Sequence, residues 1–397
     1  MVMTVSLLPL SLWFFGEASL VGALSNLLAV PVISFVIVPC ALVGVLAMAI
    51  CSPLAAPVLW LAAKLAHAQW WLLETMANWP GAHWYLPTVQ PWAMLLALVG
   101  ALWLFLPRGV PMRWLGALLF LPLLLPPREL PREGAFQAWV LDVGQGLSVV
   151  LRTRGHVLVY DTGARYPSGF DLGESTVLPS MHALGMNRLD MLMISHGDND
   201  HAGGAQSVAD AFPDAPRYAG EPERMMLPMQ QCAAGQSWQW DDVRFRVLNP
   251  AFDQAGTSAG NAKKSAKNND RSCVLLVEGR GGRLLLTGDI SVKEEPQVLA
   301  AMDPGVPPVM LVPHHGSSGS SSERFIAGIQ PTLAVVSAGW RNRFGHPRPN
   351  TLARYAAASI PVFNTAEQGA IPLDFPANGP AQRRQGWRFR ERRYWRE

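Results

Sequence analysis

The charges of this 397-residue chain are distributed very unevenly along the sequence. Up to residue 127 the charged residues are Lys64, Arg108, Arg113, Glu17 and Glu74, and all others lie beyond that point. Long apolar runs fill the same stretch, a composition typical of membrane proteins rather than of soluble domains. We therefore expect residues 1–127 to form a multi-helix transmembrane region and the remainder to fold in water.

Four apolar segments divide the first region, at residues 20–50, 53–76, 92–106 and 112–125. A span needs roughly 20 residues, so the last two segments need their flanks or a tilted setting. Pro31 and Pro39 are expected to bend or break the first segment. Trp70, Trp71 and Trp79 lie near segment ends, as in interfacial belts. The alternative is a buried helical core of a soluble protein.

Sparse basic residues predict the orientation in the membrane. Arg108 and Arg113 lie between the last two segments, whereas residues 80–91 contain no Lys or Arg. The positive-inside rule places the arginine loop in the cytoplasm. The sequence thus predicts a multi-pass membrane protein, with everything after residue 127 outside the cytoplasm.

A Pro-rich, charged linker at 128–133 separates the two parts, and short strands follow it. We expect strands at residues 138–143, 147–151, 156–160, 189–194, 243–248, 273–278, 283–287, 309–312 and 333–337. Helices are expected at residues 176–184, 205–211, 290–302 and 322–327. Strands clustered between helices indicate an α/β domain over residues 134–380, with two sheets covered by helices.

The strongest chemical signal is His196-Gly197-Asp198-Asn199-Asp200-His201, directly after the apolar run 189–194. It places two imidazoles and two carboxylates on one turn after a buried strand. Such side chains can face one point and hold divalent cations. The alternative is a polar surface loop with a chance composition.

Two further strand ends carry metal-capable side chains, namely Asp289 and the pair His314-His315. We assign His196, Asp198 and Asp289 to one metal ion, and Asp200, His201, Asp289 and His315 to a second. His314 is the alternative to His315, because neighbouring side chains on a strand point to opposite faces. A pair of Mn²⁺ or Zn²⁺ ions would activate water for an in-line displacement.

Other polar residues have candidate roles around this centre. Asp200, His314 and His346 are candidate catalytic residues, and His346 would contact a phosphate or protonate a leaving oxygen. Candidate supporting or substrate residues are Asp142, Gln145, Asp161, Asn269, Ser272 and Asn342. Asp161 would orient a metal ligand or cap its own turn. For His346 the alternative is a histidine packed in a turn.

The tail at 381–397 holds the one dense charge cluster, seven arginines interleaved with four aromatic residues. Proteins bind single-stranded nucleic acids through arginines that contact the phosphates and aromatic side chains that stack on the bases. Candidate DNA contacts are therefore Arg388, Arg390, Arg392 and Arg393. A final edge strand protected by its charges and a contact with anionic lipid are the alternatives.

Two cysteines of the second part, Cys232 and Cys273, lack the C-x-x-C spacing of a zinc finger. They can form a disulfide if this part lies outside the cytoplasm.

The motifs together resemble a known family. His196-x-Asp198-x-Asp200-His201 resembles the metallo-β-lactamase signature, which usually carries His in place of Asp198. The ComEC family of competence DNA-uptake channels has motifs in the order found here: Asp142-Val143-Gly144-Gln145-Gly146, Asp161-Thr162-Gly163, Asn268-Asn269-x-x-Ser272, Thr287-Gly288-Asp289, His314-His315-Gly316-Ser317 and Asn342-x-x-Gly345-His346-Pro347. Phe14-Phe15-Gly16 and Asn26-Leu27-Leu28 are similar to that family's membrane domain.

The resemblance implies an αββα metallo-β-lactamase-like sandwich behind a channel domain. It further implies import of single-stranded DNA across the inner membrane and degradation of the non-imported strand. The competence machinery would be a partner, and the chain would correspond to the C-terminal part of such a channel. A separate N-terminal fragment with an OB-fold would then complete the channel.

The leading hypothesis is thus a metal-dependent phosphodiesterase, or nuclease, within a DNA-uptake channel. A non-catalytic domain that guides DNA and a hydrolase of a small phosphodiester are the alternatives. Asp198 adds a hard oxygen ligand of the kind that suits manganese, and both Mn²⁺ and Zn²⁺ stay open.

Overall fold

The computed structural model describes residues 2–19, 21–50, 52–79, 81–107, 109–126, 129–251 and 268–390. The chain divides into two compact units. The first contains Met1–Arg128 with His182–Gly185, and the second contains Glu129–Met181 with Met186–Glu397. Arg392 and Arg393, two of the predicted DNA contacts, lie outside the described residues.

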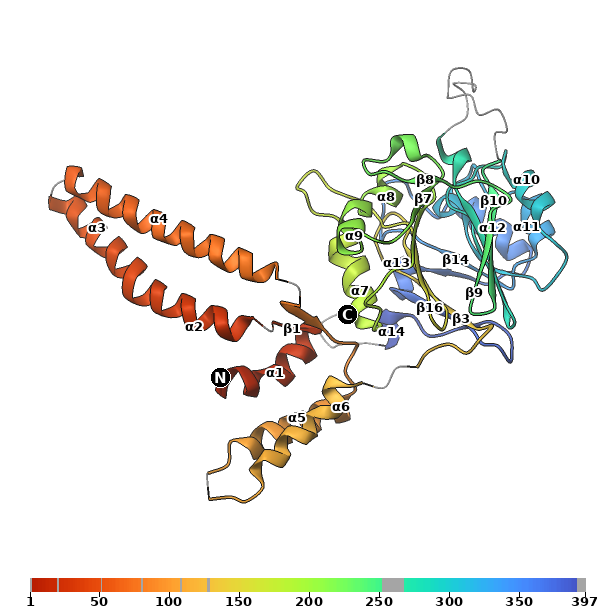
Figure 1. Ribbon diagram of the computed structural model, residues 1–397. Coiled ribbons are helices and arrows are strands. Elements are labelled where there is room, and N and C mark those ends of the chain that lie inside the picture. Colours follow the sequence, from red (N-terminus) through yellow and green to blue (C-terminus); the bar gives the residue numbers. More distant parts are fainter. Residues whose placement is uncertain are drawn as a thin grey trace. The chain divides into compact units, whose positions relative to one another are not determined.

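A long helical hairpin dominates the first unit (Figure 1). Helix α2 (Gly22–Val32), a π-helical stretch (Ile33–Ile37) and α3 (Val38–Ile50) form one continuous rod, and α4 (Ser52–Ala77) returns along it. Gly44 permits the close approach, since a Cβ there would lie 2.5 Å from Leu59 Cδ2. Pro31 does not break the helix, and the π-helical stretch follows it.

The rod from Gly22 to Ile50 is the one described helix long and apolar enough to cross a membrane, with 29 residues and a mean hydropathy of 2.7. Its large apolar side chains face outward, and Phe35 is 80% exposed. Helix α4 carries Lys64, His67 and Glu74 and does not meet the same criterion. The described residues therefore support one candidate span, and further spans remain a prediction.

Shorter elements complete the first unit. They are α1 (Val2–Phe15), β1 (Glu17–Ser19), β2 (His83–Tyr85), α5 (Pro91–Leu104), η2 (Arg113–Phe120) and α6 (Leu121–Leu124). Strands β1 and β2 pair in an antiparallel ribbon. Helix α5 packs on η2 through two glycines, because a Cβ on Gly100 would lie 2.5 Å from the Gly116 carbonyl oxygen.

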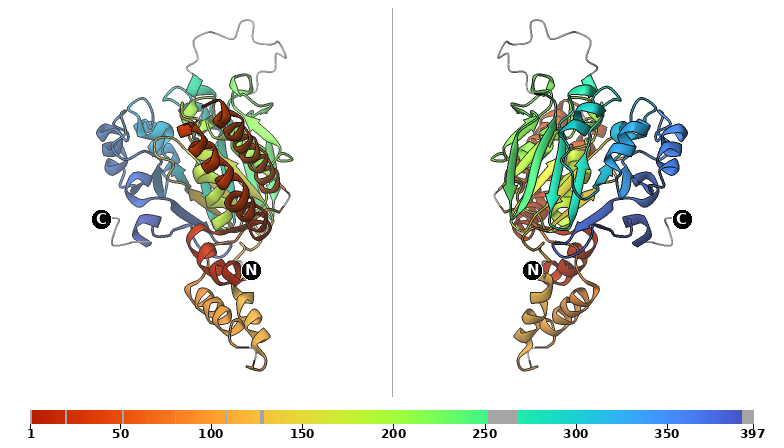
Figure 2. Two further views of the ribbon diagram at one scale, coloured as in Figure 1. Left: turned by 90° about the vertical axis from the view of Figure 1, so that its left-hand side faces the viewer. Right: turned by 90° about the vertical axis from the view of Figure 1, so that its right-hand side faces the viewer.

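The second unit is a sandwich of two sheets, seen together in Figures 1 and 2. The eight-stranded sheet has the order β17-β16-β3-β4-β5-β6-β7-β8, and the seven-stranded sheet has the order β15-β14-β13-β12-β11-β10-β9. Strand bounds in the first are β3 (Phe136–Val140), β4 (Val149–Arg152), β5 (Val157–Tyr160), β6 (Met191–Ile194), β7 (Arg217–Ala219), β8 (Gln230–Gln231), β16 (Ile371–Phe375) and β17 (Gln382–Arg383). In the second they are β9 (Ser237–Trp240), β10 (Val243–Asn249), β11 (Val274–Gly279), β12 (Gly282–Leu286), β13 (Val309–Leu311), β14 (Leu333–Val336) and β15 (Val362–Asn364).

Apolar side chains of both sheets form the core between them, with Phe136, Tyr160 and Phe245 almost wholly buried. A second cluster lies between the seven-stranded sheet and its helices, which are α10 (Glu295–Ala301), α11 (Glu323–Ile329) and α12 (Pro349–Ala357). Four further short helices are α7 (Leu178–Ala183), α8 (Asn199–Ala202), α9 (Ala205–Ala211) and α13 (Thr365–Gln368). The expected sandwich of helices and two sheets is confirmed.

The predicted tail strand needs correction. Trp387–Arg390 form one helical turn, α14, and not a strand, so the alternation of arginines and aromatics there does not mark a sheet edge. The terminal edge strand is β17, which pairs with β16. The turn is compatible with helix because Trp387 to Arg390 contain no Pro or Gly.

Candidate metal centre

The candidate site lies where strands of both sheets end. β5 and β6 run parallel in one sheet, and β12, β13 and β14 run parallel in the other. Asp161 follows β5, Ser195 to His201 follow β6, and Asp289 follows β12. His315 follows β13. The buried apolar strands place these polar residues at the rim, where side chains of both sheets meet.

Two groups of side chains converge there, His196 with His201 and Asp289, and Asp200 with His201 and His315. Within each group the candidate ligand atoms lie within 4.8 Å of one another. His201 Nε2 is 3.2 Å from His315 Nε2 and 3.3 Å from Asp289 Oδ1. Five of the six predicted metal ligands therefore lie together.

Each of the three buried histidines presents Nε2 to this point because its Nδ1 is held elsewhere. His201 Nδ1 lies 2.8 Å from Asp161 Oδ2, and His315 Nδ1 lies 2.8 Å from the Ser337 carbonyl oxygen. His196 Nδ1 lies 3.0 Å from Ser195 Oγ. A bond on Nδ1 fixes the ring and leaves Nε2 for a metal ion.

Two buried polar atoms at this point have no hydrogen-bond partner in the described part of the chain, as expected of a site that holds a cation. Among the described residues, His196 Nε2 and Asp289 Oδ1 are buried and make no hydrogen bond. Leaving such atoms unpaired inside a protein is costly, whereas a divalent cation would satisfy both. The nitrogen and carboxylate donors suit zinc and manganese alike.

Charge interactions tune the same groups. Burial alone would raise the pKa of Asp289, but nearby His201 and His315 hold that pKa well below its usual range. Burial would lower the pKa of His201, but Asp289 and Asp161 raise it well above the ordinary value. Asp289 is thus an ionised carboxylate ready to act as a ligand.

Asp198 lies at the edge of the group. Its Oδ2 is 3.5 Å from His196 Nε2, and its Oδ1 accepts a hydrogen bond from Arg224 Nη2 at 2.8 Å. The His196 and Arg224 side chains hold the pKa of Asp198 well below its usual range. Arg224 is in turn bound by Glu221, which also accepts a hydrogen bond from Gly197 N at 3.0 Å.

The two adjacent histidines do not lie on a strand, so the expectation of opposite faces is wrong. β13 ends at Leu311, and His314 and His315 adopt left-handed backbone angles with φ of 51° and 53°. His315 is buried within the second group, whereas His314 is half-buried with Nε2 3.7 Å from Asp289 Oδ2. Both therefore face the same carboxylate. The Asn269 amide lies 3.4 Å from His314 Nε2.

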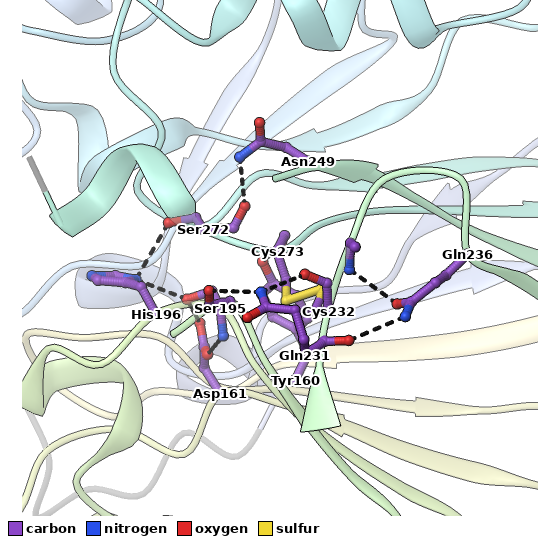
Figure 3. Close-up of a disulfide and its surroundings, with 12 residues drawn as sticks. Tyr160, Asp161, Ser195, His196, Gln231, Cys232, Gln236, Asn249, Ser272 and Cys273 are labelled. Carbon is purple, nitrogen blue, oxygen red and sulfur yellow. Dashed lines mark hydrogen bonds between the residues drawn. A yellow bond between two sulfur atoms is a disulfide. The ribbon is translucent and has the colours of Figure 1, made fainter. Parts of the chain in front are cut away.

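Two predicted supporting residues, Asp161 and Ser272, contact this group directly. Asp161, fully buried with φ of 59°, also accepts hydrogen bonds from Ser195 N at 2.6 Å and Ser195 Oγ at 2.7 Å. Ser272 Oγ accepts a hydrogen bond from Asp289 N at 3.1 Å and lies 3.4 Å from His196 Nδ1. These contacts fix the backbone that carries the candidate ligands, and Figure 3 shows those that join Asp161 to Ser195 and Ser272 to His196.

His346 stands beside the histidine pair, with its ring centroid 5.9 Å from that of His314. Asn342 holds it, since Asn342 Oδ1 accepts from His346 N at 3.0 Å. Burial, together with the His315 and His314 charges, lowers the pKa of His346 to about 4. A neutral imidazole at pH 7 suits a hydrogen bond to a phosphate better than proton donation to a leaving oxygen.

The turn with Asp142 and Gln145 supports the site from one side. Leu147 N donates to the Asp200 carbonyl oxygen at 3.1 Å, and Gly339 N donates to Gln145 Oε1 at 3.4 Å. Asp142 Oδ2 accepts from Arg388 Nη2 at 2.6 Å, so this predicted DNA contact is engaged in an internal ion pair. Arg390 lies over the Trp387 ring at 4.5 Å.

Sequence reasoning missed Ser195 as a supporting group, and also Glu221, Arg224 and Ser337. The position of Ser195 in the motif was a usable signal, because it joins the strand end to the first histidine. The other three lie 20 or more residues from the ligands that they support, and no spacing marks them.

A disulfide joins Cys232 to Cys273, with 6.0 Å between their Cα atoms (Figure 3). Cys273 follows Ser272, and its N donates to the Ser195 carbonyl oxygen at 2.9 Å. Tyr160 Oη donates to the Cys273 carbonyl oxygen at 2.5 Å. The predicted pairing is confirmed, and it lies against the backbone that supports the candidate metal ligands.

Known proteins match both units. Residues 1–111 match the family described as Competence protein, and residues 141–340 match the Metallo-beta-lactamase superfamily. Competence protein ComA of Neisseria gonorrhoeae is 34% identical over 387 residues, 96% of this chain and 52% of its own length. ComE operon protein 3 of Bacillus subtilis is 29% identical over 92% of this chain and 50% of its own length. The chain thus spans about half the length of these relatives.

A solved structure is similar to part of this chain. The metallo-beta-lactamase fold protein YhfI of Bacillus subtilis covers 60% of this chain and 99% of its own, with 10% identity and a TM-score of 0.38.

Proposed function

Because the chain belongs to the metallo-β-lactamase superfamily and matches competence proteins through both of its units, we propose that it is a membrane-bound component of DNA uptake whose lactamase-fold unit hydrolyses phosphodiester bonds in DNA. The predicted resemblance to the ComEC family is confirmed by these matches.

One observation carries the proposal. His196, His201 and His315 all turn Nε2 to one point beside the ionised Asp289 carboxylate, while their Nδ1 atoms are held by other groups. Burying imidazole nitrogens that have no partner costs free energy, and a cation bound between them would remove that cost.

The residues that would hold the ions are His196, Asp198 and Asp289 on one side, and Asp200, His201, Asp289 and His315 on the other. Bound Mn²⁺ or Zn²⁺ would supply an activated water and electrostatic stabilisation for in-line displacement at phosphorus. Asp161 and Ser272 would position ligands without touching substrate. His346, neutral at pH 7, would donate a hydrogen bond to a phosphate oxygen.

The membrane part of the proposal is a multi-pass protein in the bacterial inner membrane, with the lactamase-fold unit outside the cytoplasm. The apolar rod at Gly22–Ile50 supports a membrane setting, and the buried disulfide supports an oxidising compartment. The substrate would be the strand that is not imported. Other competence proteins and a separate channel fragment with an OB-fold would be partners.

The test uses the full-length chain in detergent, stripped with a chelator and then given Mn²⁺ or Zn²⁺. End-labelled single-stranded DNA is the substrate, and Asp289→Ala is the inactive comparison. Asp303→Ala is the matched control, because Asp303 is an exposed carboxylate that binds Arg246 away from the site. We expect cleavage that needs metal, persists in the control and falls by about 100-fold or more in Asp289→Ala.

Other results would point elsewhere. Binding of DNA without cleavage under any metal would favour a guiding role. Turnover of a small chromogenic phosphodiester without cleavage of DNA would favour a small-molecule hydrolase.

A further inference from the structure

We propose that the loop from Trp340 to Arg348 is a single-strand-binding platform at the edge of the metal centre, with bases stacked on Trp340 and Phe344 and arginines on the backbone phosphates. The loop connects β14 to α12 and carries His346. The inference deepens the proposed function and rests on it for the identity of the substrate.

The aromatic side chains of this 340–348 loop are open to solvent. Trp340 is 65% exposed and Phe344 is 41% exposed. Burying such side chains would stabilise a soluble fold, so leaving them outside favours a role in contact with a ligand. Flat aromatic faces accept any base by stacking, without sequence preference.

The same loop is strongly basic. Arg341 lies over the Trp340 ring at 5.8 Å from its centroid, and Arg343 lies over the Phe344 ring at 4.7 Å. No carboxylate of the described residues forms an ion pair with Arg341, Arg343 or Arg348. Arg388 of the tail differs, since Asp142 already neutralises it. The loop thus offers uncompensated charge for a polyanion.

The loop is fixed to the metal centre at both ends. At its start, Gly339 packs against the Gln145 turn, where a Cβ would lie 2.8 Å from Gln145 N. At its end, Arg348 N donates to the Gly316 carbonyl oxygen at 2.9 Å, next to the His314-His315 pair. A loop held in this way loses little conformational freedom on binding.

Internal bonds hold the middle of the loop. Asn342 Nδ2 donates to the carbonyl oxygens of Gly339 at 2.9 Å and of His346 at 2.5 Å. Gly345, with φ of 63°, donates to the Asn342 carbonyl oxygen at 3.0 Å. The aromatic faces are therefore displayed by a preformed turn.

The 340–348 loop lies next to the candidate metal ligands. The Phe344 and His346 rings are stacked 5.8 Å apart, and the His346 ring is 6.5 Å from that of His315. A base stacked on Phe344 would thus have its own phosphate close to His346 and the metal ligands. Paired bases bury their faces in the duplex stack, so this display selects a single strand.

The experiment measures binding by the full-length chain in detergent with a chelator present, so that cleavage does not enter the result. The probes are a fluorescent 20-mer of deoxythymidine and a 20-mer of the same charge whose nucleotides lack bases. Variants are Trp340→Leu, the conservative Trp340→Phe, and the pair Arg341→Gln with Arg343→Gln. Arg324→Gln, an exposed arginine on α11, is the charge control.

We expect Trp340→Leu to weaken binding of the thymidine probe by about tenfold, with Trp340→Phe restoring most of it. The base-free probe should respond far less to either change. The double arginine variant should reduce the slope of log affinity against log salt by about 1.4 for both probes, since each phosphate contact contributes about 0.7. Arg324→Gln should leave the slope unchanged.

Equal affinity of the wild-type chain and Trp340→Leu for the thymidine probe would overturn the proposal. So would an equal loss with the base-free probe, because it would show no stacking. If the variants instead weakened recovery on anionic phosphatidylglycerol vesicles alone, the loop would be a lipid contact. These results do not depend on whether the chain cleaves DNA, so failure of the proposed function is separately visible.

Discussion

At the scale of single residues, the site depends on side chains that never need to touch substrate. Asp161 binds Ser195 through both carboxylate oxygens and also binds His201 Nδ1. It therefore fixes the end of β6 and one imidazole at once. Loss of such a supporting contact typically costs 10- to 100-fold in metal affinity.

Replacing Asp161 with Asn tests this positioning role. Asn tolerates the left-handed backbone at this position but lacks the charge that holds His201. We expect Asp161→Asn to weaken Mn²⁺ or Zn²⁺ binding by about 10- to 100-fold, as measured by competition with a chelating dye. Unchanged thermal unfolding of the variant would show that the fold is retained. Metal affinity equal to that of the wild type would contradict the role.

The sequence marked the candidate ligands more clearly than the residues that hold them in place. His196 to His201, Asp289 and His315 were recognisable because each follows a buried apolar strand, which fixes its place at the rim. Ser337 and Glu221 are far in sequence from the residues that they contact, so they reach the site only when distant elements pack together. The choice between His314 and His315 depends on left-handed backbone angles at both residues, which a histidine in the sequence does not predict.

At the scale of elements, one corner ties the two sheets together. Asp241 and Asp242 both have positive φ and form the tight turn between β9 and β10. Asp241 Oδ2 accepts hydrogen bonds from Thr153 Oγ1 at 2.6 Å and Gly155 N at 2.7 Å, in the turn between β4 and β5 of the other sheet. It also lies 3.0 Å from His156 Nδ1.

Replacing Asp241 with Asn should destabilise this corner in a pH-dependent manner. Partial burial raises the pKa of Asp241, but hydrogen bonds from Thr153 and His156 outweigh it and lower the pKa overall. A lowered pKa stabilises the fold above the ordinary aspartate value of about 4, and the benefit is lost as pH falls through the folded value.

We therefore expect Asp241→Asn to lose about 1–3 kcal/mol at pH 7, as measured by denaturant unfolding, with a smaller difference below pH 4. Asp242→Asn is the neighbouring control, because Asp242 binds only exposed Arg280 and Gln239 among the described residues. If the difference in unfolding free energy between the wild type and Asp241→Asn stayed constant with pH, the charge of Asp241 would not stabilise this turn.

The disulfide is the second link between layers. It joins Cys232, just after β8, to Cys273, just before β11 of the other sheet. Closing a loop with a sequence separation of 41 residues stabilises a fold by roughly 4 kcal/mol in the chain-entropy treatment. We expect reductant to lower the unfolding temperature of the wild type, while leaving the double variant Cys232→Ala with Cys273→Ala unchanged. Equal temperatures with and without reductant would contradict the link.

Apolar strands were predictable, whereas exposed elements were not. β5, β6, β12 and β13 consist of buried residues and stand out as apolar runs. β8 is two exposed glutamines, and its pairing with β7 depends on tertiary context. Helix α10 begins at Glu295 and not at residue 290, because Pro296 sits naturally in a first helical turn.

At the scale of the whole molecule, the chain joins two units of opposite character. The first has a rod with large exposed apolar side chains, and the second buries its apolar residues between two sheets. The asymmetry of charge along the sequence predicted this division, because charged side chains are excluded from a membrane interior. The number of spans was less predictable, since Lys64, His67 and Glu74 leave α4 ambiguous.

A charge in the centre of the rod should disturb its membrane setting. Phe35 lies near the middle of Gly22–Ile50 and is 80% exposed. An arginine there costs about 2.5–3.5 kcal/mol on insertion scales. We expect Phe35→Arg to reduce the alkali-resistant membrane fraction, with Phe35→Leu behaving as the wild type. Full retention of Phe35→Arg in that fraction would argue against a spanning rod.

We propose above that the histidine and carboxylate cluster is a metal centre that hydrolyses DNA. The most direct test is a titration of the chelator-treated, full-length chain with Mn²⁺ or Zn²⁺, in which bound metal and cleavage of single-stranded DNA are measured on the same samples. We predict that cleavage rises with metal occupancy and reaches its maximum at about two ions per chain. Saturating metal without cleavage, or cleavage that does not change with bound metal, would contradict it.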